Sequence, residues 1–315
     1  MDLLKTIVAR SPLLPAMRVM TRRFGRVLLY HRVVNDDCDP LVRGLLGGIT
    51  QTAFRHQLDY LDKHYKVVTL WEMLNRIDHP YKLAAITFDD GYADNLYNAL
   101  PLLEARRMPA TIFVVAGFVG SGRRAWWNQL ARMIIKNGPN PLRFETEKGV
   151  IDFPFRGSYD RQMTSVGRWL RNLSESRREA LFADEFRCDE DRFLDPEEMK
   201  HLEQRGVKIE AHTVNHPRLS SLSAGEVAKE LTECKSMLEQ WLESPVRYTA
   251  YPYGRPGDFN RETMEAARRA GYEAAFAAGD GLVHAGVDRY AVPRIGTREH
   301  FYRFQLRVSR WRRVH

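Results

Sequence analysis

Two adjacent carboxylates, Asp89 and Asp90, stand at the end of an apolar run and are followed by Gly91. The run at residues 84–88 predicts a buried β-strand, and the glycine predicts a sharp turn after it. Neighbouring carboxylates repel each other unless a cation or a shared proton lies beside them. The pair therefore predicts a metal site at a strand end, with an ordinary acidic turn as the plainer alternative.

Two histidines, His212 and His216, follow a second apolar run at residues 207–211. Imidazoles at this spacing face one cation if the segment makes a helical turn. Two neutral imidazoles with one carboxylate are a common Zn²⁺ ligand set that leaves one position open for water. Surface histidines four residues apart also arise by chance, so the prediction depends on their combination with the two carboxylates.

A third polar group, Tyr-Pro-Tyr-Gly at residues 251–254, follows another short strand pattern. The rigid Pro252 and the permissive Gly254 could expose backbone N–H groups to a developing oxyanion. The alternative interpretation is an ordinary Pro-Gly turn.

Alternating strand and helix patterns must position these three groups. Strands are expected near residues 27–31, 67–70, 84–88, 110–116, 207–211, 249–251, 274–277 and 290–295, with helices between them. Thr50, Asp195 and Ser223 stand where three of these helices should begin. About seven strand–helix units favour a parallel α/β barrel over an open sheet, and the functional sites of such barrels lie at the carboxyl ends of the strands.

The regular alternation loosens between about residues 120 and 195. This stretch predicts a helix led by Trp126 and Trp127 and a hairpin near residues 143–153. We interpret it as an insertion in a single domain that spans residues 27–297. Basic segments flank that domain at residues 1–26 and 298–315.

The net charge of +8 is concentrated in the two end segments. Each holds six Lys or Arg residues and one acidic residue, which leaves the body of the chain at about −2. Apolar residues are interleaved with these charges, and the mixture suits peripheral contact with an anionic membrane. The alternative is two solvated, partly packed ends. A nucleic-acid partner is not expected, because the body is nearly neutral and contains no nucleic-acid-binding motif.

The sequence also indicates a compartment. No apolar run is long enough to span a bilayer, and charged residues and prolines interrupt the N-terminal segment where a signal peptide would need an apolar core. The three cysteines, Cys38, Cys188 and Cys234, are widely spaced, which argues against a disulfide framework and against a thiolate metal site. We therefore expect a cytoplasmic protein that contacts the inner face of the cytoplasmic membrane.

The three polar groups together resemble the motifs of the polysaccharide deacetylases, the carbohydrate esterase group that shares the nodulation-type deacetylase domain. Thr-Phe-Asp-Asp-Gly at residues 87–91 matches the first motif of that family. His212-Thr213-x-x-His216 matches the second, and residues 251–254 match a common form of the third. The order is also that of the family, and the resemblance extends from about residue 27 to residue 295.

The resemblance implies a distorted (β/α)7-type barrel and metal-dependent removal of an N-acyl group from an amino sugar. It implies that Asp90, His212 and His216 hold a divalent metal, with Zn²⁺ expected first and Co²⁺, Ni²⁺ or Mn²⁺ as alternatives. It further implies that Asp89 is the general base toward water and that the backbone N–H of Tyr253 binds the oxyanion. These roles agree with the chemistry of a cation next to an ionised carboxylate.

Two departures from the family pattern concern the remaining groups. The third motif often carries an arginine that orients the base, but Ala250 stands at that position here. Arg294, near the end of a later strand, could supply the charge. The general acid of the family is a histidine in a Leu-x-His pattern, and this chain offers both His31 and His284. We prefer His31, because it ends an apolar strand and resembles the Tyr-His-Arg-Val opening of family members with circularly permuted motifs.

The leading hypothesis is therefore an N-deacetylase that acts on an N-acetylated saccharide, either a polysaccharide or a lipid-linked glycan precursor. One alternative is another carbon–nitrogen hydrolase on the same barrel, such as a deformylase. A second is a carbohydrate-binding protein without catalytic activity. All four residues expected to hold the metal and act as the base are present, which argues against the second alternative.

Overall fold

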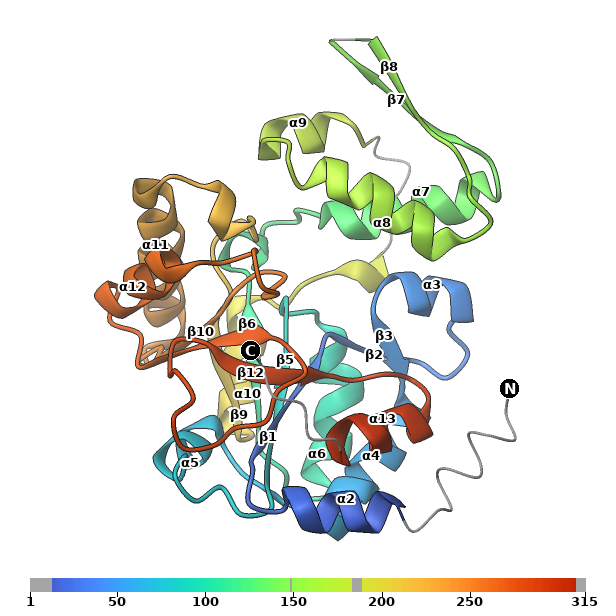
Figure 1. Cartoon of the computed structure of the whole chain (residues 1–315). Coiled ribbons are helices and arrows are strands. Elements are labelled where there is room, and N and C mark those ends of the chain that lie inside the picture. Colours follow the sequence, from blue (N-terminus) through green and yellow to red (C-terminus); the bar gives the residue numbers. More distant parts are fainter. Residues whose placement is uncertain (1–12, 148, 183–188, 310–315) are drawn as a thin grey trace.

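A closed barrel of seven parallel strands forms the centre of the protein (Figure 1). The computed structural model describes residues 13–147, 149–182 and 189–309. The strands follow the order β1-β12-β11-β10-β9-β6-β5, and β5 pairs with β1 to close the ring. This confirms the predicted parallel barrel.

The barrel strands are short and apolar because parallel strands are covered on both faces. Every residue of β1, β5, β6 and β10 is buried. The seven strands are β1 (Arg26–Tyr30), β5 (Leu83–Phe88), β6 (Ala110–Val114), β9 (Val207–Ala211), β10 (Tyr248–Ala250), β11 (Ala274–Ala278) and β12 (Val292–Gly296).

One strand prediction was wrong in its extent. The strand expected over residues 67–70 is only β4 (Lys66–Val67), which pairs with the first residues of β5. Thr69 instead caps α5 (Leu70–Asn75), because its side chain accepts a hydrogen bond from the backbone N–H of Glu72. An N-cap contact thus overrides the β-propensity of this threonine.

Helices cover the outside of the barrel (Figure 1). Three predicted N-caps are confirmed: the side chains of Thr50, Asp195 and Ser223 each accept a backbone N–H from the first turn of their helix. The helices are α2 (Leu13–Thr21), α4 (Gln51–His64), α6 (Leu100–Glu104), α10 (Pro196–Gln204), α11 (Ala224–Leu242), α12 (Arg261–Arg269) and α13 (Phe301–Ser309), with short helical turns at η1 (Asn95–Ala99), η2 (Ala116–Phe118), η4 (Asp189–Asp191) and η5 (Leu219–Ser221).

The segment between β6 and β9 packs around an apolar cluster of its own. It contains α7 (Trp126–Asn137), the antiparallel hairpin of β7 (Leu142–Thr146) and β8 (Gly149–Phe153), α8 (Tyr159–Leu170) and α9 (Glu175–Ala180). The helix and the hairpin expected here are therefore present. Leu130, Ile134, Phe144 and Val166 are among its buried residues. Figure 1 shows these elements above one end of the barrel, beside α3 (Pro40–Leu45) and the β2 (Arg32–Val34) and β3 (Gly48–Thr50) pair.

The basic C-terminal segment is partly folded onto the barrel. In α13, Phe304 and Val308 are fully buried in the main core, so these two apolar side chains are not available to a membrane. Five further apolar residues of the end segments lie outside the described residues: Leu3, Leu4, Ile7, Val8 and Trp311. None of the described helices has the length and apolar character that crossing a bilayer requires.

Candidate active site

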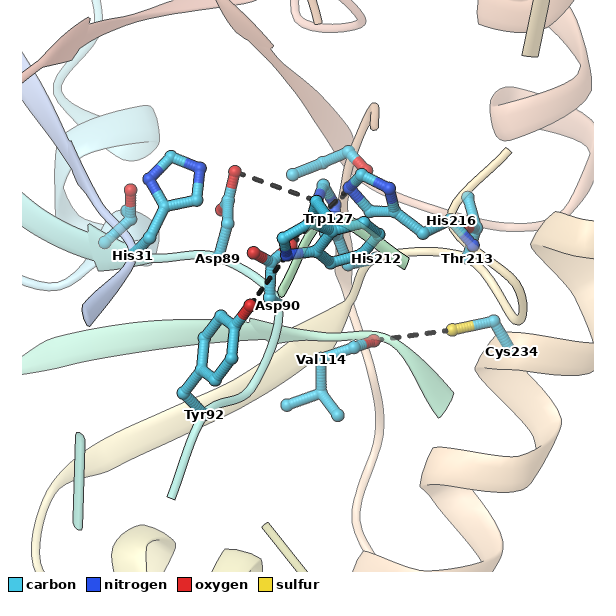
Figure 2. A network of polar contacts seen from close by, with 12 residues as sticks. His31, Asp89, Asp90, Tyr92, Val114, Trp127, His212, Thr213, His216 and Cys234 are labelled. Atoms are coloured by element: carbon cyan, nitrogen blue, oxygen red, sulfur yellow. Dashed lines mark hydrogen bonds and ion pairs between the residues drawn. The ribbon is translucent and has the colours of Figure 1, made fainter. Parts of the chain in front are cut away.

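The turn after β5 brings two adjacent carboxylates to the same site. Ala85 belongs to one core cluster and Ile86 and Phe88 to another, as expected for alternating sides of a strand, and Asp89 continues the side of Ala85. Asp90 would point to the other side, but its φ of +74° turns the chain. Both carboxylates therefore face His212 Nε2, at 3.8 Å from Asp89 Oδ2 and 3.7 Å from Asp90 Oδ1 (Figure 2).

Arg294 on β12 pairs with Asp89 in the way the sequence predicted. Its Nη1 and Nη2 atoms donate to the two carboxylate oxygens of Asp89, and both residues are almost completely buried. Burial alone would raise the pKa of Asp89, but Arg294 and then His212 hold the pKa below its usual value. Asp89 is therefore kept ionised, as a general base must be.

The loop after β9 presents His212 and His216 without the expected helical turn. Thr213 and His216 have φ values of +66° and +53°, and the His216 N–H donates to Thr213 Oγ1. The carboxylate of Glu230, on α11, accepts the backbone N–H groups of Val214 and Asn215 at 2.8 and 2.9 Å. A buried loop held from α11 thus replaces the predicted helical turn.

The hydrogen bonding of His212 defines its tautomer. Nδ1 lies 2.8 Å from the carbonyl oxygen of Ala250, which can only accept, so Nδ1 carries the proton and Nε2 offers a lone pair. Burial lowers the pKa of His212 to about 4, and it lowers the pKa of His216 well below the usual value. Both imidazoles are therefore neutral near pH 7 and suited to bind a metal.

Asp90, His212 and His216 fit a divalent cation. One ligand atom from each lies within 4.8 Å of the others, and all three residues are buried. Asp90 Oδ1 has no hydrogen-bond partner among the described residues and lies 3.5 Å from His216 Nε2. Burial and the charge of Asp89 raise the pKa of Asp90 well above its usual value. A cation between these atoms would remove both costs, because it compensates a buried carboxylate.

The two histidines considered as general acid lie at opposite ends of the barrel. His31 directly follows β1, and Figure 2 shows its imidazole beside the carboxylate of Asp89. His284 is exposed and packs on Phe24, which precedes β1, and its neighbour Val283 pairs with Gly25. His284 was an alternative prediction, and the structure excludes it from the site. It lies in the connection between β11 and β12, at the end of the barrel where the strands begin, whereas the site is at the end where they finish.

Tyr253 reaches the site from the loop after β10. Its φ is +61°, its ring centroid lies 4.9 Å from that of His216, and its backbone N–H has no partner among the described residues. Gly254 donates to the carbonyl of Pro252 and accepts from Ala278, so the loop is held close to β11. The Tyr253 N–H is thus available to a ligand beside the metal ligands.

Three contacts from outside the motifs were not predicted. The ring of Trp127, on α7, lies 4.6 Å from that of His216, and its indole N–H donates to the hydroxyl of Tyr92 at 2.7 Å. The Arg171 guanidinium, from the end of α8, lies 5.0 Å from the centre of the Tyr253 ring. In the sequence, the only related signal was the pair Trp126 and Trp127 at the start of a predicted helix. The sequence did not indicate where that helix would pack.

A comparison with protein families identifies the family to which the chain belongs. The family model for polysaccharide deacetylase matches residues 76–146 and 158–275, which is more than half of the sequence. The chain belongs to the polysaccharide deacetylase family. The candidate metal ligands Asp90, His212 and His216, with Tyr253, lie within the matched part, whereas His31 and Arg294 lie outside it.

Named relatives of this deacetylase chain cover most of its length. YxkH of Bacillus subtilis, which carries a polysaccharide deacetylase name, is 23% identical over 274 residues, or 85% of this chain and 70% of the relative. The poly-β-1,6-N-acetyl-D-glucosamine N-deacetylase of Staphylococcus aureus is 21% identical over 271 residues, or 85% of this chain and 73% of the relative.

Solved structures of deacetylases share the fold. The Streptococcus pyogenes deacetylase PplD, solved with acetate, has a TM-score of 0.61 at 20% identity, covering 88% of this chain and 93% of its own. IcaB from Ammonifex degensii has a TM-score of 0.59 at 22% identity, covering 91% and 97%. The TM-scores, over most of each chain, show a common fold.

Proposed function

We propose that this deacetylase-family protein removes N-acetyl groups from amino-sugar residues by hydrolysis that depends on a divalent cation. One observation carries the proposal. The ionised carboxylate of Asp89, held by Arg294, lies directly beside the Asp90, His212 and His216 set, with 3.8 Å between Asp89 Oδ2 and His212 Nε2. A base and a cation site at this separation suit the attack of water on an amide carbonyl.

Each residue has a defined task in the proposed reaction. A cation held by Asp90, His212 and His216 would supply Lewis acidity; Zn²⁺ fits the two imidazoles and one carboxylate, and Co²⁺, Ni²⁺ or Mn²⁺ are alternatives. Asp89 takes the proton from the attacking water. The Tyr253 N–H donates to the oxygen that gains negative charge. His31 then protonates the departing sugar nitrogen, which becomes an amine as acetate forms.

Saccharide is the preferred substrate class because of the named relatives. The Staphylococcus aureus relative is a poly-β-1,6-N-acetyl-D-glucosamine N-deacetylase by name, and this supports an N-acetylated hexosamine polymer. The same site chemistry would also serve a sugar formamide. A non-catalytic saccharide-binding protein has little support, because such a protein would not need the buried Arg294–Asp89 pair beside unpartnered metal-ligand atoms.

Contact with an anionic membrane, and with it a cytoplasmic location at the inner face, is a separate proposal. It is supported by the charge of the two end segments. The buried Phe304 and Val308 limit what the C-terminal segment can contribute. A lipid-linked saccharide whose sugar chain extends well away from the lipid is the substrate that would combine the two proposals.

The test is product release from a panel of N-acetylated oligosaccharides, polymers and lipid-linked sugars. We expect acetate and a free amine in equal amounts, abolished by chelator and by Asp89→Asn. Formate release from N-formyl sugars in place of acetate would favour the deformylase. If the metal-loaded protein bound a saccharide but released neither acetate nor formate, the proposed activity would be refuted.

A further inference from the structure

A basic pocket of about 220 Å³ lies at the end of the barrel opposite the candidate active site. Its walls come from α2, from the end of α4 and from the turn before β5, all of which precede barrel strands. The residues that matter for the argument are Arg18, Val19, Arg22, Lys63, His64 and Lys82.

The cations of this pocket are not neutralised by acids. None of Arg18, Arg22, Lys63 and Lys82 forms an ion pair with any residue in the described ranges, and no acidic residue lines the pocket. Arg18 Nη1 instead donates to the hydroxyl of Tyr60 at 3.1 Å, and the Arg22 guanidinium lies 5.9 Å from the centre of the Tyr81 ring. The pocket therefore offers a concentrated, uncompensated positive charge.

The basic residues are held close to one another. Lys82 has a φ of +52°, and its N–H donates to the carbonyl of Arg22 at 2.8 Å, which fixes the end of the α2 segment against the start of β5. The pKa of His64 reflects the nearby positive charges. Partial burial and the charges of Arg18, Lys63 and Lys82 lower it to about 4. The backbone thus maintains a cluster of like charges at some cost, as binding sites often do.

Apolar side chains are exposed beside these charges. Val19 and Met20, on α2, are 59% and 69% exposed, and Tyr81, next to Lys82, is 49% exposed. A free phosphate ion or a nucleic-acid backbone would gain nothing from them. The interface of a lipid bilayer, where phosphate groups lie next to acyl chains, matches both features.

The two ends of the described chain meet at the same place. Thr21 Oγ1 donates to the carbonyl of Ser309 at 3.4 Å, and Tyr60 Oη lies 3.2 Å from Ser309 Oγ. In the sequence, three arginines follow Ser309 within four residues, and residues 1–12 with Lys5 and Arg10 precede α2. Further basic residues are therefore close in sequence to the two ends of the described chain.

We propose that this pocket binds the phosphate headgroup of an anionic membrane lipid, with Val19 and Met20 in contact with the upper acyl region. The proposal is independent of the catalytic activity. It has a consequence for orientation, because the carboxyl ends of the strands, and with them Asp89 and His31, lie on the far side of the barrel from the bilayer. A saccharide chain extending into the aqueous phase would then reach the site, whereas a sugar lying at the lipid headgroups would not.

Sedimentation of the full chain with vesicles tests the proposal. We expect binding to vesicles that contain phosphatidylglycerol and none to phosphatidylcholine alone. Arg22→Glu and Lys63→Glu should each lower the partition constant roughly five- to tenfold, and Met20→Ser should lower it as well. Lys229→Glu is the control, since it reverses an exposed charge on α11, which does not line the pocket, and should leave binding unchanged.

Several outcomes would overturn the proposal. One is equal binding of the two vesicle types, and another is unchanged binding after both charge reversals in variants whose circular dichroism is native. Inorganic phosphate that binds in an Arg22-dependent way without vesicle binding would assign the pocket to a free anion. Duplex DNA that competes through the same residues would assign it to nucleic acid.

Discussion

Arg294 and Asp89 form a two-point ion pair, with Nη1 2.6 Å from Oδ1 and Nη2 2.8 Å from Oδ2. The planar guanidinium fixes the plane of the carboxylate, which a lysine ammonium cannot do. We therefore expect Arg294→Lys to lower kcat by roughly a hundredfold, because the base is then misdirected by a fraction of an ångström or more. Steady-state kinetics on folded protein measures this.

Arg26 provides the control for burial. It is also fully buried, at the other end of the barrel, where Nε donates to the carbonyl of Val308 and Nη2 to Thr21 Oγ1. Arg26→Lys should lower the thermal midpoint but leave kcat unchanged. If Arg294→Lys behaved in the same way, the pair would only stabilise the fold.

His31 should carry the proton to the leaving nitrogen, and His284 should not. His31→Ala is expected to lower kcat by about 10² to 10⁴, the usual cost of losing a general acid. His284→Ala removes an exposed imidazole at the opposite end and should leave turnover unchanged. A sugar derivative with a good leaving group needs less help from an acid and should lose less rate with His31→Ala. Equal losses on both substrates would contradict this role.

Asp90 should be needed for metal binding itself. Asp90→Ala removes the only carboxylate of the buried ligand set, so we expect the metal content of purified protein to fall from about one ion per chain to nearly none. Asp89→Asn, one residue away, should retain most of the metal while losing activity. Elemental analysis separates the two cases. Loss of metal in both variants, or in neither, would show that the carboxylates do not divide the work as proposed.

Gly254 is required by space as well as by conformation. A Cβ at Gly254 would lie 2.6 Å from the backbone nitrogen of Ala278, whereas at Gly257, which also has positive φ, the nearest group is the end of the Arg218 side chain at 3.8 Å. Gly254→Ala should therefore destabilise the fold clearly more than Gly257→Ala, which loses only about 1 kcal/mol from backbone strain. Thermal denaturation of the two variants measures the difference. Equal losses of stability would mean that the loop at Gly254 can shift to accept a Cβ, contrary to this prediction.

Glu210 should make the stability depend on pH. Burial raises its pKa from 4.5 to about 8, although its Oε2 accepts the N–H groups of Arg247 and Tyr248 at 2.8 and 2.7 Å. The folded state then binds the proton more tightly than the unfolded chain, so the free energy of unfolding should fall as pH rises from about 4.5 to about 8. Glu210→Gln should flatten this decline by more than about 1 kcal/mol. Urea denaturation at several pH values measures it, and an unchanged slope would contradict the shift.

The sequence was sufficient for those parts of the site that are local. The Asp89-Asp90 turn and the loop with His212 and His216 each follow an apolar strand, and parallel strands bring their carboxyl ends together. The proximity of Arg294 to Asp89 could be predicted for the same reason, since Arg294 too stands near a strand end. The choice between His31 and His284 depends on the strand direction at each position, and only His31 follows a strand that ends at the site.

Other features could not be predicted because they depend on packing between distant segments. Trp127 contacts His216 only because α7 folds back over the barrel end, and no periodicity in residues 120–195 indicates that angle. The left-handed backbone at Asp90 and Tyr253 gave no sequence signal either, since neither residue is glycine. Tertiary contacts impose these conformations on residues that do not prefer them.

The pairing of β1 with β5 and with β12 has a consequence for synthesis of the protein. Asp89 receives one partner, His31, from the first barrel strand and the other, Arg294, from the last. A nascent chain on the ribosome therefore has the carboxylate and one histidine early, but it cannot orient the base until β12 has emerged and closed the ring. Deacetylase activity should thus be absent from every fragment of the chain that ends before β12.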